Sequence, residues 1–271
     1  MVNIIQISDL HYGSGFRQDC FENIVEYLQK KRPDALVLTG DLVDKGRYKQ
    51  YIGFKENIYS RLKELDIPMV QVIGNHDAKR NGIIFFERFF GSRWSKLTLE
   101  EKDTVILGLC SARDDVSEGE IGDIQLEHVA RQFNRVIENR VLALHHHVIG
   151  VPYSGRKRTT LMDAGELIEL CHLFQVDLVL QGHKHIPHAH ILGSTTFLYC
   201  GTSTTDKVRA DESPSFNYIE LDKGDLRVQI VNSETLEEDL LVERKDDMTV
   251  FVRPRKTRIE HLLNNKIFGQ Y

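Results

Sequence analysis

The sequence predicts an α/β protein of four layers (αββα), in which two packed mixed β-sheets are flanked by helices. Two observations predict this fold. Through the first two-thirds of the 271 residues, short apolar runs of strand length alternate with stretches whose apolar residues have helical spacing. After about Gly193 the pattern changes to strands and turns, which adds a β-rich end to the alternating part.

The alternating part begins with the apolar run Val2–Ile7, which predicts a strand. A helix follows, because apolar residues recur three and four positions apart between residues 21 and 28. Pro68 closes the next helix, since proline cannot continue it, and a third strand follows. The predicted strands of this part cover residues 2–7, 35–39, 69–73, 104–109, 141–144 and 178–180. Its predicted helices lie near residues 21–28, 54–65, 124–133 and 164–174.

The β-rich end contains four predicted strands, with the Lys223-Gly224 pair as a hairpin turn between two of them. These strands cover residues 196–199, 216–221, 226–231 and 249–252. The sequence has no internal repeat, no low-complexity segment and no linker-like stretch. We therefore expect a single domain over residues 1–271, with a core at 1–245 and a C-terminal extension at 246–271.

Composition and charge narrow the range of functions. The chain carries 40 acidic and 35 basic residues, a formal net charge of −5, which argues against nucleic-acid binding through bulk positive charge. The four cysteines show no C-x-x-C spacing and are expected to be reduced thiols. We find neither a signal peptide nor an apolar stretch long enough to span a membrane, so we expect a cytoplasmic protein without membrane contact. The oligomeric state is left open, with a homodimer among the alternatives.

Polar residues able to bind a metal or move a proton follow five of the apolar strands. Carboxyl ends of parallel strands are where open α/β sheets place their sites. Any one of these turns alone has an ordinary structural explanation, since Asp, Asn and Gly are common turn residues. Seven of the twelve histidines nevertheless lie in these turns, and an accidental conjunction of all five is improbable. The turns are Asp9-Leu10-His11, Gly40-Asp41-Leu42-Val43-Asp44, Gly74-Asn75-His76-Asp77, His145-His146-His147 and Gly182-His183-Lys184-His185.

In this order the motifs resemble those of the calcineurin-like metallophosphoesterase superfamily: D-x-H, G-D, G-N-H-[D/E], H and G-H-x-H. They span residues 9 to 185, about two-thirds of the chain. The length and the G-N-H-D and H-H-H turns look most like the bacterial cyclic-nucleotide and glycerophosphodiester phosphodiesterase branch. Val148 and Ile149 depart from that branch, which often has proline there.

The resemblance implies a dinuclear metal site at the C-terminal ends of the strands. One ion would be bound by Asp9, His11, Asp41 and His185, and the other by Asp41, Asn75, His145 and His183, with Asp41 bridging the two. Nitrogen and oxygen ligands without thiolate suit Mn²⁺, Fe²⁺/Fe³⁺ or Zn²⁺. Within the triplet, matching from the strand end favours His145 as the ligand, and His146 or His147 would face the substrate or support the ligands.

The resemblance also implies roles for three further residues and an activity. His76 matches the proton-donor position, whereas Asp44 and Asp77 would orient neighbouring groups. The expected activity is hydrolysis of a small phosphate ester, with a phosphodiester such as a cyclic nucleotide or a glycerophosphodiester favoured. The alternatives are a phosphomonoesterase, a nuclease or a non-catalytic interaction scaffold of the same fold. We also expect the basic loop Ser154-Gly155-Arg156-Lys157-Arg158 either to capture the substrate phosphate or to be a solvated surface loop.

Overall fold

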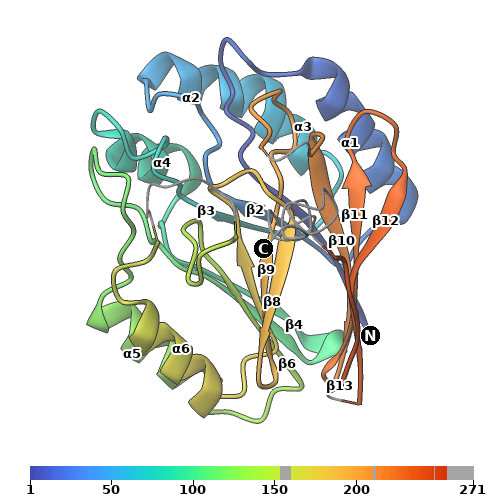
Figure 1. Ribbon diagram of the computed structural model, residues 1–271. Helices are drawn as coiled ribbons and strands as arrows, with labels where there is room; N and C mark the ends of the chain where they lie inside the picture. The colour runs from blue at the N-terminus through green and yellow to red at the C-terminus, as the bar shows by residue number, and fades with distance from the viewer. Residues whose placement is uncertain (153–159, 210–211, 247, 255–271) are drawn as a thin grey trace, which may run out of the picture.

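A computed structural model describes residues 1–152, 160–209, 212–246 and 248–254 of the chain. Within these residues the strands form two mixed sheets that pack face to face, with helices on the outer face of each (Figure 1). The seven-stranded sheet has the order β13-β12-β11-β10-β1-β2-β3, and the six-stranded sheet has the order β4-β5-β6-β7-β9-β8. The predicted four-layer αββα arrangement is confirmed.

The helices and strands have the following bounds. The strands are β1 (Val2–Ile7), β2 (Ala35–Thr39), β3 (Met69–Val72), β4 (Ser95–Leu99), β5 (Thr104–Gly108), β6 (Asn139–Ala143), β7 (Leu178–Gln181), β8 (His188–Leu192), β9 (Thr195–Tyr199), β10 (Ser215–Asp222), β11 (Asp225–Asn232), β12 (Glu238–Lys245) and β13 (Met248–Val252). The helices are α1 (Gln18–Lys31), α2 (Tyr48–Phe54), α3 (Ser60–Lys63), α4 (Gly82–Phe90), α5 (Asp123–Phe133) and α6 (Ala164–Leu173), and a π-helical turn (Lys55–Tyr59) joins α2 to α3.

Each sheet contains a set of neighbouring parallel strands. In the seven-stranded sheet β2 pairs in parallel with both β1 and β3, and in the six-stranded sheet β5, β6, β7 and β9 pair in parallel in that order. Antiparallel strands extend the seven-stranded sheet on one side, beyond β1, and the six-stranded sheet on both sides, as β4 and β8. Because the parallel strands run in one direction within each sheet, their carboxyl ends come to the same edge.

Three apolar clusters separate the four layers. The central one packs the two sheets together, with Ile4 of β1 and Val141 of β6 among its fully buried members. Ile5, the next residue of β1, faces the opposite way and packs under helices α1 to α4. Leu142 of β6 likewise packs under α5 and α6. This alternation along single strands is what lets each sheet bury both of its faces.

The predicted strands are all present in the structure, with boundaries shifted by one or two residues. The predicted hairpin turn is also confirmed, since Lys223 and Gly224 both have positive φ angles, 53° and 91°, between β10 and β11. The helix predicted over residues 54–65 is instead the sequence of α2, the π-helical turn and α3. Helix α4 and strands β4, β8 and β12 were not predicted, and β13 extends the seven-stranded sheet past Lys245.

Among the described residues no helix is both long enough and apolar enough to cross a membrane.

Candidate metal centre

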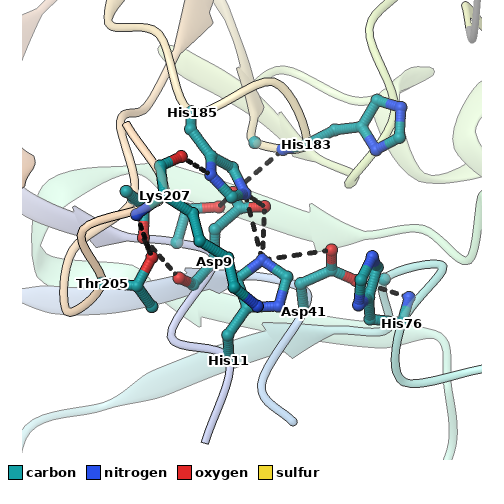
Figure 2. Close-up of polar contacts among 12 residues, drawn as sticks. Asp9, His11, Asp41, His76, His183, His185, Thr205 and Lys207 are labelled. Atoms are coloured by element: carbon teal, nitrogen blue, oxygen red, sulfur yellow. Dashed lines mark hydrogen bonds and ion pairs between the residues drawn. The ribbon is translucent and has the colours of Figure 1, made fainter. Parts of the chain in front are cut away.

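The candidate site lies where the carboxyl ends of the parallel strands of both sheets meet. Three of its loops follow β1, β2 and β3 of the seven-stranded sheet, and two follow β6 and β7 of the six-stranded sheet. Figure 2 shows how the side chains of Asp9, His11 and His185 point toward one another, with Asp41 beside them. The residues brought together are Asp9, His11, Asp41, Asn75, His76, His145, His183 and His185.

One group of donor atoms comes from Asp9, His11 and His185, whose nearest ligand atoms all lie within 4.8 Å of one another. The two histidine Nε2 atoms are 3.0 Å apart, and the Nε2 atom of His185 is 3.1 Å from Oδ1 of Asp9. That carboxylate oxygen is buried and accepts no well-formed hydrogen bond from the described residues. Two imidazole nitrogens and a carboxylate oxygen this close to one another require a shared proton or a shared cation.

A second group forms around His145. Its Nε2 atom is 3.4 Å from Oδ2 of Asp41 and 3.2 Å from Oδ1 of Asn75. The same Asn75 oxygen is 2.9 Å from Nδ1 of His183. Oδ2 of Asp41 is also 3.7 Å from Nε2 of His11, so this carboxylate lies between the two groups.

Backbone carbonyls fix which nitrogen carries the hydrogen in two of the histidine rings. Nδ1 of His145 is 2.7 Å from the Thr39 carbonyl oxygen, and Nδ1 of His185 is 2.6 Å from the Lys207 carbonyl oxygen. A carbonyl oxygen can only accept, so each Nδ1 carries the hydrogen and each Nε2 keeps its lone pair when the ring is neutral. Since both Nε2 atoms face the carboxylates, the rings are oriented as metal ligands are.

The loops that carry these side chains have an unusual backbone. Asp9, His11, Asp41, His183 and His185 all have positive φ angles, between 47° and 77°. Such left-handed conformations are uncommon outside glycine and are held only where the surroundings fix them, often at functional sites. Here they turn successive side chains of a tight loop toward one point.

Burial and charge make the centre favourable for cations. Burial works to raise the pKa of Asp41 and of Asp9, but the neighbouring histidines outweigh it and hold both pKa values below the usual range. Burial works to lower the pKa of His145, but the Asp41 carboxylate raises it to about 9. The two carboxylates are therefore ionised, and the buried cluster attracts positive charge. The buried Asp9 oxygen that faces His185, the mixed nitrogen and oxygen donors and the two facing carboxylates all fit divalent ions.

His76 lies at the rim of the centre. Its backbone N–H donates to Oδ1 of Asp41 at 2.7 Å, and its ring Nδ1 is 2.7 Å from the Asp44 carbonyl oxygen. The ring packs edge-on against that of His11 and is partly exposed. This histidine is therefore close to the donor groups and partly open to solvent, a position from which a side chain can transfer a proton.

Asp44 and Asp77 have different surroundings. Oδ1 of Asp44 lies 3.7 Å from Nδ1 of His11 and 3.8 Å from Nδ1 of His76. Asp77 instead accepts hydrogen bonds from three backbone N–H groups, those of Leu42, Val43 and Gly74. Burial, with a smaller effect of the Asp41 charge, raises the pKa of Asp77 to about 7. Asp77 thus ties the loop after β2 to the loop after β3 and contacts no predicted ligand side chain in these bonds.

The three histidines of the triplet face three directions. His145 alone points at Asp41 and Asn75. Nδ1 of His146 pairs with the Ser111 hydroxyl at 2.9 Å, and Nε2 of His147 donates to the Gly182 carbonyl at 2.7 Å. Both rings are fully buried, so neither is open to a substrate in this conformation.

A sixth loop contributes to the site, and our sequence reasoning missed it. It follows β9, which pairs in parallel with β7, and it runs from Gly201 to Lys207. The signal was present, because a strand at 196–199 was predicted and a polar Gly-Thr-Ser-Thr-Thr run follows it. By contrast, the predicted basic loop Ser154-Gly155-Arg156-Lys157-Arg158 lies outside the described residues.

The fold and this centre define a class, the metal-dependent phosphoesterases with two packed sheets. A dimetal phosphatase from Danio rerio has the same fold, with a TM-score of 0.68 and 13% sequence identity over 88% of this chain and 98% of that one. Residues 2–187 match the family Calcineurin-like phosphoesterase. The chain belongs to this family, and the family implies divalent metals at a dinuclear site.

Similar proteins of known sequence are named for different activities. The cyclic adenosine monophosphate phosphodiesterase CpdA of Escherichia coli is 30% identical over 205 residues, which cover 68% of this chain and 70% of that protein. A probable glycerophosphodiester phosphodiesterase, GpdQ of Arcobacter nitrofigilis, is 29% identical over 157 residues, or 53% of this chain and 56% of that protein. The DNA double-strand break repair protein Mre11 of Methanosarcina acetivorans is 28% identical over 249 residues, covering 84% of this chain but 38% of the relative.

Proposed function

We propose that this chain hydrolyses small phosphodiesters with the help of two divalent ions. The observation that carries the proposal is the convergence of buried carboxylate, amide and imidazole donors on both sides of Asp41. With two divalent ions bound, a centre of this kind would carry local positive charge and would attract an anionic phosphate even though the protein as a whole is acidic.

The proposed ligands of the first ion are Asp9, His11, Asp41 and His185, and those of the second are Asp41, Asn75, His145 and His183. The contacts among these donor atoms support this division, and the turn of His146 and His147 toward Ser111 and Gly182 supports His145 as the ligand of the triplet. Manganese, iron or zinc would fit this donor set, which has no thiolate. When bound, such a pair of ions supplies Lewis-acid stabilisation of the phosphate oxygens.

The protein's own residues position the metal-binding rings and protonate the leaving group. The Thr39 and Lys207 carbonyls hold His145 and His185 with their Nε2 atoms toward the carboxylates. His76 is the proposed proton donor: with Nδ1 bound to the Asp44 carbonyl, its other nitrogen, Nε2, can pass a proton to the departing alkoxide. The proton leaves the cationic ring, which becomes neutral, and the alkoxide becomes an alcohol.

The substrate class can be tested directly. The metal-stripped protein would be reloaded with Mn²⁺, and kcat/KM measured for 3′,5′-cyclic AMP, a glycerophosphodiester, bis-p-nitrophenyl phosphate and p-nitrophenyl phosphate. We expect the diesters to be hydrolysed faster than the monoester, in line with the names of the relatives CpdA and GpdQ. A monoester hydrolysed more efficiently than every diester would contradict the proposal.

A second candidate is hydrolysis of phosphodiester bonds in DNA, favoured by the similarity to Mre11 over most of this chain. The net charge of −5 argues against it. Linear duplex and single-stranded DNA belong in the same assay, and cleavage of DNA without hydrolysis of the small diesters would favour this candidate.

We also propose that the protein works in a reducing compartment such as the cytoplasm. The support is that Cys20, Cys110, Cys171 and Cys200 are all buried and unpaired. Fractionation of cells producing the tagged full-length chain would test the location.

A further inference from the structure

Side-chain hydroxyls of the sixth loop, residues 201–207 after β9, hydrogen-bond to the loop after β1 that carries Asp9 and His11. Thr202 Oγ1 donates to the Asp9 carbonyl at 2.7 Å, and Thr204 Oγ1 donates to the Leu10 carbonyl at 2.8 Å. The Ser203 N–H donates to the Ser8 carbonyl at 3.0 Å, and the Ser203 Oγ accepts from the Ser8 N–H at 3.0 Å. All these side chains are buried. The turn that follows, 205–207, is therefore held at a fixed place beside the left-handed loop of Asp9 and His11.

Lys207, at the end of this turn, reaches the centre with two different atoms (Figure 2). Its carbonyl oxygen accepts the Nδ1–H of His185 at 2.6 Å. Its ammonium Nζ donates to Oδ1 of Asp44 at 2.8 Å, and its own N–H donates to Thr205 Oγ1 at 3.1 Å. One residue thus joins a histidine after β7 to a carboxylate after β2, that is, one sheet to the other.

Asp44 in turn faces His11. Nδ1 of His11 is buried and has no hydrogen-bond partner among the described residues, and the Asp44 carboxylate oxygen at 3.7 Å is a charged acceptor close to it. A metal-binding histidine almost always donates its outer N–H to such an acceptor, which fixes the direction of the metal-binding nitrogen. The Asp44 side chain is 7% exposed, so its position depends on its partners more than on water.

We propose that the Lys207 side chain is a positioning residue that orients His11 toward the first ion by holding Asp44, while the backbone carbonyl of the same residue, which any residue could supply, holds His185. This inference rests on the proposed function, because it concerns the first of the two proposed ion sites. The Lys207 ammonium also explains a second group of close donor atoms. His11, Asp44 and His76 offer three donor atoms within 4.8 Å of one another, and the Lys207 ammonium supplies the positive charge at this group.

A neighbouring lysine provides a matched control. Lys45 approaches the same carboxylate, but its Nζ is 3.9 Å from Oδ2 of Asp44. The side chains of Lys45 and Lys207 are equally exposed, at 52% and 50%. Removing either charge changes the net charge of the protein by the same amount, so a difference between the two variants reports on the specific contact.

The experiment measures Mn²⁺ binding to the metal-stripped full chain by isothermal titration calorimetry, together with kcat and KM for bis-p-nitrophenyl phosphate. The variants are Lys207→Met, Lys207→Arg, Lys45→Met, Asp44→Asn and the double variant Lys207→Met/Asp44→Asn, each checked for folding by circular dichroism. We expect Lys207→Met to weaken one of two Mn²⁺ sites about 10-fold, the lower end of the range for partners of metal ligands. Lys207→Arg should recover most of the affinity, and Lys45→Met should change it less than about 2-fold.

The double variant tests the route through Asp44. If Lys207 acts on His11 by holding Asp44, adding Lys207→Met to Asp44→Asn should weaken Mn²⁺ binding by less than about 2-fold further. Two unchanged Mn²⁺ affinities in Lys207→Met would overturn the proposal while leaving the proposed function intact. A raised KM with unchanged Mn²⁺ affinity would also overturn it, because Lys207 would then bind the substrate. A wild-type chain that binds fewer than two ions contradicts the proposed function and this inference together.

Discussion

Asp41 is the residue on which the two donor groups depend. Its Oδ2 lies 3.7 Å from Nε2 of His11 and 3.4 Å from Nε2 of His145, while its Oδ1 accepts the His76 N–H. A carboxylate fixed in this way on one side presents its other oxygen to both groups at once. Asp9 also lies near both histidines, with its Oδ1 3.8 Å from Nε2 of His11 and a ligand atom within 4.8 Å of one of His145.

We therefore expect Asp41→Ala to abolish phosphoesterase activity and to lower the metal content to one ion or fewer per chain. The near-isosteric Asp41→Asn should behave similarly while disturbing the packing less. Metal content would be measured by inductively coupled plasma mass spectrometry, and folding by circular dichroism. The exposed Asp114 is the matched control, and Asp114→Ala should retain both ions. Two tightly bound ions with normal turnover in Asp41→Ala would exclude a shared ligand.

His76 should behave differently, because it touches the centre through its backbone N–H and its ring edge. His76→Ala should keep a metal content near that of the wild type and reduce kcat by roughly 10²–10⁴-fold, the usual contribution of a positioned proton donor. The loss should be larger for alkyl than for p-nitrophenyl leaving groups, since poor leaving groups need the proton most. His172, exposed on α6, offers the control His172→Ala. An equal loss for both leaving groups would argue for electrostatic positioning instead of proton donation.

Among the helices and strands, those predicted correctly were the ones whose burial produces a simple run or spacing of apolar residues. The parallel strands of the two sheets are mostly apolar, so β1, β2, β5 and β7 could be recognised from composition alone. Strand β12 was missed because Glu238–Lys245 alternates weakly and is largely charged, as suits a strand near the edge of a sheet. Helix α4 was missed although Ile83, Phe86 and Phe90 recur three and four positions apart, because apolar residues on its other side, such as the exposed Ile84, obscure that spacing.

At the site, residues that follow recognisable strands could be predicted, whereas Lys207 and the backbone carbonyls could not. The residues expected from the motifs do lie together, because each follows a recognisable parallel strand of one of the two sheets. Lys207 could not be placed, since nothing local indicates that β9 lies beside β7 and in parallel with it. The roles of the Thr39 and Lys207 carbonyls could not be predicted from the sequence either, because any residue supplies the same backbone oxygen.

Close approach of two loops makes a glycine indispensable at Gly74. A Cβ atom there would lie 2.2 Å from Oδ1 of Asp41 and 2.3 Å from the Asp41 backbone nitrogen. We expect Gly74→Ala to push the two loops apart, to cost about 1–3 kcal/mol in the free energy of unfolding and to impair metal binding. Urea unfolding and metal content would be measured against Gly165→Ala, where an added Cβ would contact nothing within 4 Å. That control should be neutral or more stable, and equal behaviour of both variants would contradict the close-approach argument.

At the scale of the whole molecule, the centre joins two sheets that otherwise meet through an apolar interface. Direct polar links across it include the bond from Gln6 Nε2 on β1 to the Gln181 carbonyl on β7, at 3.0 Å. The proposed ligands of each ion come from both sheets: Asp9, His11 and Asp41 follow strands of one sheet, and His185 follows a strand of the other. Ions bound there would connect the layers of the fold as well as serve the reaction.

Removal of metal should therefore destabilise the entire fold. The donor atoms come from loops up to 176 positions apart, from Asp9 to His185, so the unfolded chain cannot bind an ion in the same way. A ligand at 100 times its dissociation constant stabilises the native state by about 2.7 kcal/mol, which raises Tm by roughly 5–10 °C in a chain of this size. Thermal unfolding with Mn²⁺ and with EDTA would measure the shift. Asp41→Ala, which should lose at least one ion, should show a shift clearly smaller than that of the wild type. A Tm that is the same with Mn²⁺ and EDTA, for a wild-type chain shown to bind two ions, would mean that the ions do not hold the two sheets together.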